Sequence, residues 1–236
     1  MAVPLIVLVH GAFAESAGWN GVIERLTQYG LPVLAVANPL RSLAGDASYL
    51  RDAIAGLARP VMLVGHSYGG MVITQAATGT PAVKALVYVA GFAPEPGESA
   101  AQLSLTFPGS TLGSALTSTP LADGSTDQSI EPARFAHQFA ADVDPDAAAL
   151  MAATQRPITD RALGDALDAP TAAWRTIPSW FVWGGADRNI PAAASRYMAQ
   201  RARARELREI DGASHAVAVS QPGPVSEVIR EAAAHI

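Results

Sequence analysis

Short runs of consecutive hydrophobic residues recur along the chain, and the stretches between them carry hydrophobic residues at every third or fourth position. Continuous apolar runs are typical of strands that are buried on both faces of a parallel sheet. They predict strands over residues 5–9, 33–36, 61–64, 85–89, 180–183 and 207–210. The helical spacing predicts helices over residues 19–29, 47–57, 69–77, 192–203 and 225–234.

Strands and helices alternate along most of this pattern, as they do where parallel strands are joined by right-handed crossovers. The predicted fold class is α/β, a doubly wound, mostly parallel six-stranded sheet. A chain of 236 residues is long enough to form one such domain with a full core. We therefore predict a single domain over residues 1–236.

One interval breaks the alternation. Residues 92–175, between the fourth and fifth strands, contain many prolines and small residues, amphipathic fragments at 132–141 and 146–154, and no convincing strand. An insertion of this length is unusual for a strand connection. We predict a helical cap that covers the carboxyl ends of the strands, where open α/β sheets bind ligands. The core is then formed by residues 1–91 and 176–236.

A Gly-His-Ser-Tyr-Gly pentapeptide at residues 65–69 lies between a predicted strand and a predicted helix. A GxSxG motif in this context is a nucleophile elbow, a sharp turn that exposes a serine hydroxyl at the end of a parallel sheet. Its glycines are needed because side chains there would collide with neighbouring backbone. Ser67 is the predicted nucleophile.

A serine hydroxyl needs a base within hydrogen-bond reach and an acid that orients the base. Asp187 follows the strand at 180–183, and His215 lies in a loop of small residues after the last strand. The order serine, aspartate, histidine is that of the α/β-hydrolases. We predict Ser67, Asp187 and His215 as the catalytic residues.

Other residues compete for two of these roles. Asp187 could instead cap the helical region that follows it, with the acid supplied by Asp211, Glu95 or Glu98. The remaining histidines are less suited to be the base than His215, because His66 lies inside the elbow, His137 on a cap helix and His235 at the terminus. His10 is interpreted as rigidifying the loop in which it lies.

The negative charge of a tetrahedral intermediate requires an oxyanion hole of backbone N–H groups. One donor is expected from Tyr68, at the start of the helix after the nucleophile, and another from Phe13 or Ala12, after the first strand. Phe13, Tyr68 and Phe92 adjoin strand ends at the site and are the predicted substrate contacts. Most other large apolar side chains, among them Trp19, Phe107, Phe135, Phe139, Met151 and Trp174, are expected to serve packing instead.

The composition excludes several function classes. Half of the residues are hydrophobic and 16% are charged, with a net charge of -5, so neither disorder nor nucleic-acid binding is expected. The chain contains no cysteine, which excludes thiolate metal sites and a cysteine nucleophile. No signal peptide or membrane-spanning run is predicted. We expect a cytoplasmic protein that acts on a small molecule, as a monomer or homodimer.

The motifs at residues 7–12 with Trp19, at 65–70, at 184–187 with 190–191, and at 212–215 together resemble a known family. The chain resembles the α/β-hydrolases, in particular small bacterial carboxylesterases related to the plant methylesterase and hydroxynitrile lyase group. The resemblance covers nearly the whole chain. It implies a six-stranded sheet that lacks the first antiparallel hairpin of larger relatives, and a site without metal or cofactor.

Departures from the lyase members narrow the expected reaction. Those members carry a lysine after the catalytic histidine and a threonine after the first-strand histidine, where this chain has Ala216 and Gly11. Dehalogenase relatives need an aspartate at the position of Ser67. We expect a serine carboxylesterase that hydrolyses small to medium apolar esters through an acyl-enzyme. The alternatives are a receptor-like protein with little turnover, a hydroxynitrile lyase, a lactonase or a perhydrolase.

Overall fold

The computed structural model describes residues 4–236, which form a parallel six-stranded sheet in the order β2-β1-β3-β4-β8-β9. The strands are β1 (Leu5–Val9), β2 (Val33–Val36), β3 (Val61–His66), β4 (Val83–Val89), β8 (Ser179–Gly184) and β9 (Glu206–Ile210). The predicted fold class is confirmed. Each predicted strand lies within an observed one, with ends that differ by at most two residues.

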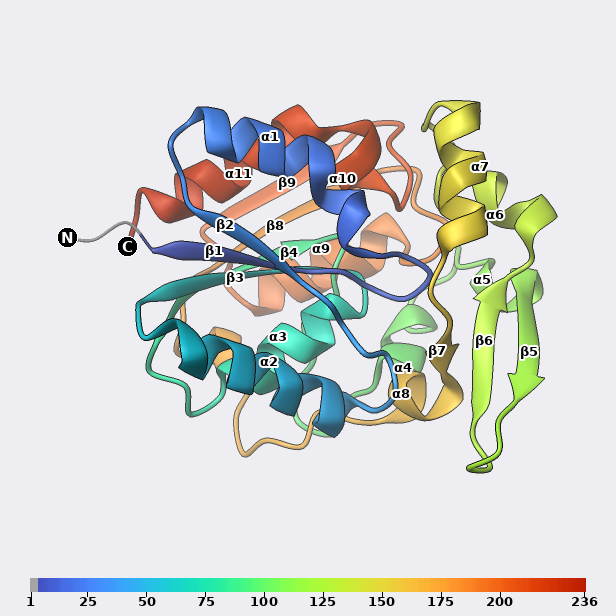
Figure 1. Cartoon of the computed structure of the whole chain (residues 1–236), viewed down its shortest axis with the longest axis horizontal. Helices are drawn as coiled ribbons and strands as arrows, with labels where there is room; N and C mark the ends of the chain where they lie inside the picture. Colours follow the sequence, from blue (N-terminus) through green and yellow to red (C-terminus); the bar gives the residue numbers. More distant parts are fainter. Residues whose placement is uncertain (1–3) are drawn as a thin grey trace.

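Helices cover both faces of this sheet (Figure 1). Helices α1 (Asn20–Gln28) and α11 (Pro222–Ala233) pack together on one face, and α2 (Leu43–Leu57) and α3 (Gly69–Ala77) pack together on the other. Helix α9 (Ala192–Arg201) packs against β8 and β9. Two short helices, η1 (Ser16–Trp19) and α10 (Val217–Ser220), complete the layer next to α1.

The centre of the sheet is the centre of the hydrophobic core. Every residue of β1, β3 and β8 is buried, as continuous apolar runs require. In the edge strands β2 and β9, every residue except Val36 is partly buried or exposed. The carboxyl ends of the central strands are therefore held rigidly from both faces. This rigidity extends to the loops that begin at those ends.

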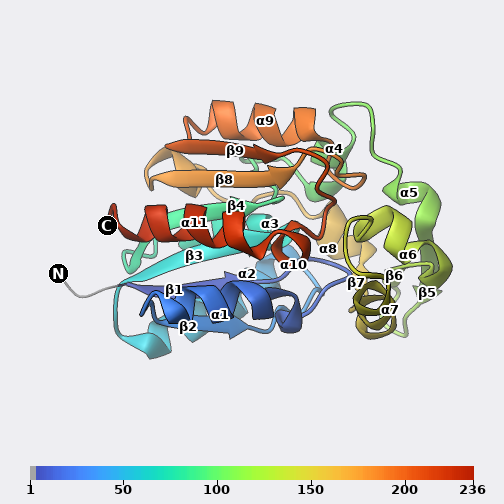
Figure 2. The ribbon, with the colours of Figure 1, turned by 90° about the horizontal axis from the view of Figure 1, so that it is seen from above.

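The segment between β4 and β8, residues 90–178, is here called the insertion. It lies at the carboxyl end of the sheet (Figures 1 and 2). Its helices are α4 (Ala100–Ser104), α5 (Leu112–Ala115), α6 (Pro132–Phe139), α7 (Pro145–Thr154), α8 (Asp160–Gly164) and η2 (Ala173–Arg175). The division into a core and a cap over residues 92–175 stays a prediction.

The expectation that the insertion contains no strand was wrong. Strands β5 (Leu116–Pro120), β6 (Thr126–Ile130) and β7 (Ile158–Thr159) form a three-stranded antiparallel sheet. The sequences of β5 and β6, Leu-Thr-Ser-Thr-Pro and Thr-Asp-Gln-Ser-Ile, are mostly polar because this hairpin is largely open to solvent. Hydrophobic patterning is therefore too weak there to mark a strand.

Hydrogen bonds to backbone carbonyl oxygens attach the insertion to the loops of the main sheet. Thr159 N–H donates to Leu40 O (3.1 Å), and the Thr159 hydroxyl donates to Arg41 O (2.7 Å). Phe13 N–H donates to Arg156 O (3.0 Å). The strand β7 region thus binds both the loop after β1 and the loop after β2.

Candidate active site

Ser67 lies in the sharp turn between β3 and α3, with φ 53°. A left-handed conformation is strained for a serine, and its neighbours hold it in place by close backbone packing. A Cβ atom on Gly69 would lie 2.5 Å from Val9 O, and one on Gly70 would lie 2.2 Å from Phe92 O. The elbow predicted from the sequence is present, and its glycines are required by close approach of three backbone segments.

Ser67 Oγ lies 2.9 Å from His215 Nε2, and His215 Nδ1 lies 2.6 Å from Asp187 Oδ2. His215 follows β9, Asp187 follows β8, and their side chains are 1% and 0% exposed. The three predicted residues, which come from loops after three different strands, are therefore joined in one continuous hydrogen-bonded chain. This arrangement can transfer a proton from the serine hydroxyl to the imidazole while a carboxylate fixes the tautomer.

The second oxygen of Asp187 is also fixed. Asp187 Oδ1 accepts hydrogen bonds from the backbone N–H groups of Asn189 (2.7 Å) and Ile190 (2.9 Å). These N–H groups can only donate, so the carboxylate plane is set independently of the histidine. Asp187 is positioned to accept from His215 with its other oxygen.

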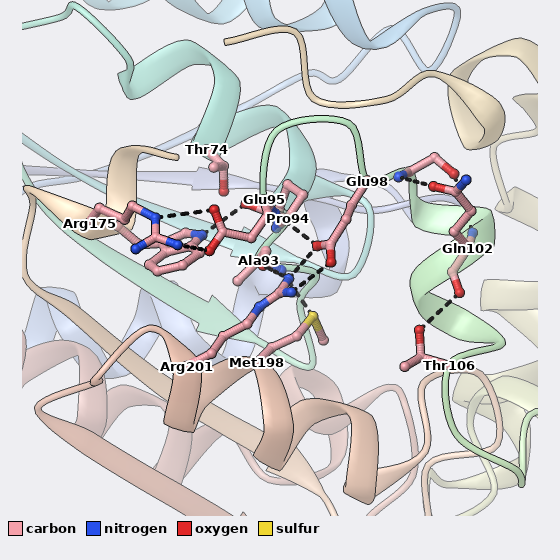
Figure 3. Close-up of polar contacts among 12 residues, drawn as sticks. Thr74, Ala93, Pro94, Glu95, Glu98, Gln102, Thr106, Arg175, Met198 and Arg201 are labelled. Carbon is pink, nitrogen blue, oxygen red and sulfur yellow. Dashed lines mark hydrogen bonds and ion pairs between the residues drawn. The ribbon is translucent and has the colours of Figure 1, made fainter. Parts of the chain in front are cut away.

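The alternative acids lie elsewhere. Glu95 pairs with Arg175, and Glu98 accepts from Arg201 Nη1 at 2.7 Å, as Figure 3 shows. Both ion pairs fasten the start of the insertion to residues near β8 and α9. Asp211 is exposed to solvent. None of the three hydrogen-bonds to His215.

His66 and His10 support the site without reaching Ser67 Oγ. His66 Nε2 donates to the backbone oxygen of His215 (3.0 Å) and so holds the histidine loop. Burial, with the nearby His215 as a further cause, lowers the pKa of His66 to about 3. Because His66 stays neutral, it adds no positive charge beside His215.

His10 has the role that the sequence suggested. The Asn38 N–H donates to His10 Nε2 (3.0 Å), so the ring proton is on Nδ1, which donates to Gly11 O (2.9 Å). Burial lowers the pKa of His10. The neutral ring ties the loop after β1 to the loop after β2. The remaining two histidines, His137 and His235, are exposed.

The three proposed oxyanion donors differ in availability. The N–H groups of Tyr68 and Ala12 donate to no other group in residues 4–236. The Phe13 N–H is already bonded to Arg156 O. Of the two donors expected from the loop after β1, the geometry therefore favours Ala12 over Phe13, because of this contact with the insertion. Phe13 also has a left-handed backbone, with φ 58°.

A cavity of about 190 Å³ opens beside Ser67. Phe13, Tyr68 and Phe92 lie in its wall, as expected for residues next to strand ends. The Tyr68 hydroxyl turns away from the reaction centre and donates to Asp46 Oδ2 (2.9 Å), so the ring contributes an apolar surface. Burial raises the pKa of both groups of this pair.

Most of the cavity wall was not anticipated from the sequence. The insertion supplies Ala100, Ala101, Ser104, Leu105, Ser110, Leu112, Gly113, Leu116 and Leu163, and the loop after Asp187 supplies Asn189 and Ile190. Asn189 and Ile190 lie two and three residues after the predicted acid, and this proximity was a usable signal. The others lie in short, weakly patterned segments whose orientation depends on tertiary packing. The other large apolar residues considered for the wall, such as Trp19, Phe135, Phe139 and Trp174, pack elsewhere.

No helix within residues 4–236 is long and apolar enough to cross a bilayer. No group of three or more histidine, aspartate or glutamate side chains there is arranged to hold a metal ion.

The sequence matches the family described as "Alpha/beta hydrolase family" over residues 6–228. A carbendazim hydrolyzing esterase of Nocardioides sp. is 35% identical over 106 residues, which are 39% of this chain and 44% of the relative. A probable hydrolase R7 of Phoma sp. is 31% identical over 114 residues, which are 42% of this chain and 47% of the relative. These matches span about half the length of the curated relatives.

Solved structures share the fold over nearly the whole chain. Polyneuridine aldehyde esterase superposes with a TM-score of 0.83 at 19% identity, covering 98% of this chain and 99% of the other. The methylesterase MES16 of Arabidopsis gives 0.83 at 18% identity, covering 99% and 100%. A pyrethroid hydrolase of Sphingobium faniae gives 0.76 at 21% identity, covering 99% and 98%.

Proposed function

This chain belongs to the α/β hydrolase family, and from that premise we propose that it is a serine carboxylesterase for small to medium apolar esters. One observation carries the proposal. Ser67, His215 and Asp187 form one hydrogen-bonded series whose serine lies in the wall of an apolar cavity, and the nearby N–H groups of Tyr68 and Ala12 donate to no group within residues 4–236.

In the proposed reaction, Ser67 Oγ attacks the ester carbonyl carbon while His215 Nε2 takes the hydroxyl proton. The distance of 2.9 Å between these two atoms supports direct proton transfer. Asp187 stabilises the imidazolium that forms, and His66 is neutral and does not oppose that charge. Catalysis at neutral pH is then possible without a lowered serine pKa.

The tetrahedral oxygen receives hydrogen bonds from the N–H groups of Tyr68 and Ala12. The Tyr68 N–H lies at the start of α3, where the helix dipole also favours negative charge. Each donor of this kind typically contributes about 3 kcal/mol to transition-state stabilisation. His215 then protonates the leaving alcohol, and the ester bond breaks to give an acyl-serine and free alcohol. Water activated by His215 hydrolyses the acyl-serine.

The cavity lining supports a neutral, largely apolar substrate. None of its lining residues is charged, and most are alanine, leucine or aromatic residues. A charged acyl group would lose its hydration there without gaining a counter-charge. Esters with neutral acyl and alcohol groups are therefore the proposed substrates.

The position of Gly11 supports hydrolysis over cyanohydrin cleavage. A Cβ atom at residue 11 would lie 2.6 Å from Ser67 Cβ and 2.8 Å from His66 O. The threonine that the lyase members carry there does not fit this backbone. Ala216, at the position of their lysine, supplies no positive charge.

The test is hydrolysis of a p-nitrophenyl ester series by the wild-type protein and by Ser67→Ala. We expect a preference for short neutral acyl chains and a loss of turnover on the order of ten-thousandfold or more in the variant. A fluorophosphonate should label Ser67 in the wild type only. An unreactive Ser67 would favour a receptor-like protein, and full turnover by Ser67→Ala would overturn the assignment.

A further inference from the structure

Asn189 is a buried polar residue at the cavity that the proposed mechanism does not use. It follows Asp187 by two positions, is 3% exposed and belongs to the cavity wall. Its backbone N–H donates to Asp187 Oδ1, which fixes the main chain at this point. The side-chain amide is a separate group whose orientation is set by residues of the insertion.

Hydrogen bonds of Gln138 fix the orientation of the Asn189 side-chain amide, that is, the positions of its oxygen and its nitrogen. Gln138 Nε2 donates to Arg188 O (2.9 Å), and a carbonyl oxygen can only accept, so the nitrogen of Gln138 is identified. The same nitrogen donates to Asn189 Oδ1 (2.8 Å). Thr111 Oγ1 donates to Gln138 Oε1 (2.9 Å) and completes the network. The Asn189 oxygen is thus directed to Gln138, and its Nδ2 is on the opposite side of the amide.

Asn189 Nδ2 donates to no group within residues 4–236. It is also absent from the small group of fully enclosed polar atoms that lack a partner in that range, so it keeps accessible surface. Water can reach this group while the cavity is empty, but a ligand that excludes the water without supplying an acceptor leaves the N–H unpaired, at a cost of about 1–3 kcal/mol. A ligand with an oxygen at this place avoids that cost.

The other polar side chains of the wall are less suited to fix a ligand. The Ser104 hydroxyl donates to Ala101 O (2.9 Å), and the Tyr68 hydroxyl donates to Asp46. Ser110 carries a hydroxyl that can rotate and can donate or accept. Asn189 is different because its network leaves only a donor available, in one fixed direction.

We propose that Asn189 Nδ2 is a hydrogen-bond donor to the substrate, and that preferred esters carry a second neutral acceptor, such as an ether or carbonyl oxygen, besides the scissile ester group. The inference rests on the proposed esterase function and names its substrate class. A site that presents a fixed donor discriminates against analogues that lack the acceptor, because the donor is then left unpaired.

Two pairs of esters, each differing by one replacement of CH2 by oxygen, test the proposal. The acyl pair is p-nitrophenyl pentanoate and p-nitrophenyl 3-methoxypropanoate, and the alcohol pair is butyl butanoate and 2-methoxyethyl butanoate. The ratio of kcat/KM for ether over alkyl ester is measured in the wild type, in Asn189→Leu, and in Asn20→Leu. Asn20 is an exposed residue on α1 and provides the matched control.

In Asn189→Leu the ether-to-alkyl ratio should fall about fivefold from its wild-type value for at least one pair, the effect of one neutral hydrogen bond. The ratio should stay at the wild-type value in Asn20→Leu. Dividing by the wild-type ratio removes the intrinsic reactivity of each ester. An unchanged ether-to-alkyl ratio in Asn189→Leu for both pairs would overturn the proposal. A further variant, Ser110→Ala, is measured in the same way, and a fall of the ratio there but not in Asn189→Leu would also overturn it.

A readout independent of turnover separates this inference from the proposed function. In the Ser67→Ala protein, binding of the same p-nitrophenyl pair is followed by ¹⁵N NMR of the side-chain amides, with the Asn189 signal assigned by its absence in Ser67→Ala/Asn189→Leu. The methoxy ester should shift the Asn189 signal and bind about fivefold more tightly. Equal binding of both esters without that shift would contradict the role of Asn189, whereas hydrolysis that persists in Ser67→Ala would contradict only the proposed function.

Discussion

The parallel sheet and the insertion contribute different parts of one cavity. Loops after β3, β8 and β9 carry Ser67, Asp187 and His215, whereas the insertion supplies most of the wall opposite them. Every residue of β3 is buried, while four of the five positions of β5 are exposed. The rigid region therefore holds the proposed reacting groups, and the more exposed region surrounds the substrate.

This division of roles is also visible in how close the backbones lie. Glycines of the elbow have neighbouring backbone atoms within 3 Å of where a Cβ would be, whereas Gly113 and Gly164 in the insertion have no atom within 4 Å of theirs. Substitutions near the ends of the main strands should thus affect turnover and folding strongly. Substitutions in the insertion should mainly alter selectivity.

Asp187→Asn should give the largest effect, a fall in kcat of about ten-thousandfold. The backbone N–H groups of Asn189 and Ile190 would keep the amide oxygen of the variant, so its NH2 group would face His215 Nδ1. His215 would then carry its proton on the wrong nitrogen. Turnover of p-nitrophenyl butanoate measures the loss, and an unchanged melting temperature shows that folding is intact. A fall of less than tenfold would mean that Asp187 does not orient the base.

Two alanine variants compare how substitutions in the two regions change the free energy of unfolding: Gly70→Ala beside the elbow and Gly164→Ala in the insertion. A Cβ at Gly70 would lie 2.2 Å from Phe92 O, and displacing that backbone should lower the free energy of unfolding by about 3 kcal/mol. Gly164, in α8, has open space around its Cβ, and the alanine should stabilise by about 0.5 kcal/mol through chain entropy. Urea unfolding of both variants measures the difference. Equal destabilisation would remove the contrast between sheet and insertion.

Acid should destabilise the elbow region through His66. The unfolded pKa is about 6.5, and the folded pKa is lowered by burial to about 3, so the unfolded state binds more protons between these values and stability falls as the pH falls. The contribution of His66 to the free energy of unfolding is fully present above the pKa that it has in the unfolded state. Between pH 7 and pH 5, protonation of His66 in the unfolded state should lower the free energy of unfolding by about 2 kcal/mol.

Urea unfolding of the wild type and of His66→Gln at both pH values checks this contribution. The variant should lose less stability on acidification than the wild type. His10, whose pKa is also lowered by burial, acts in the same direction and remains in both proteins. Equal losses in the two proteins would mean that His66 does not become protonated on unfolding.

Leu112→Ala, in the insertion, should have the smallest effect. Removal of this wall residue enlarges the cavity, so the ratio of kcat/KM for hexanoate over acetate esters should rise about threefold, or about 0.7 kcal/mol. The p-nitrophenyl series measures the ratio, and Leu34→Ala, on the exposed edge of the main sheet, is the control. A larger loss of kcat for every ester than in Asp187→Asn would contradict the division between the two regions.

The central strands of the main sheet were predictable because they are buried along nearly their whole length. A strand such as β1 therefore appears in the sequence as an uninterrupted apolar run, with the same bounds in prediction and structure. Strands β5 and β6 gave no such signal because most of their side chains are polar and partly or fully exposed, and the pairing depends on backbone hydrogen bonds. The small sheet of the insertion was accordingly missed.

The same distinction applies to the candidate site. The positions of Ser67, Asp187 and His215 follow local rules, since each lies within five residues of the end of a strand. The choice between Ala12 and Phe13 does not, because it is decided by the distant Arg156. The donor role of Asn189 likewise depends on Gln138, whose contact no local pattern indicates.

The hydrogen bond from Phe13 to Arg156 has a consequence for building chimaeras from members of this family. It joins two main-chain groups, so it is kept whatever side chains stand at either position, but it is lost if the backbone path at residue 156 changes. A protein that combined this sheet with another member's insertion would keep the serine, the histidine and the aspartate. Without a carbonyl at the place of Arg156 O, it would lose the hydrogen bond that holds the Phe13 backbone next to Ala12. A chimaera that takes its insertion from a relative should therefore keep the segment of this chain around Arg156 together with its loop after β1.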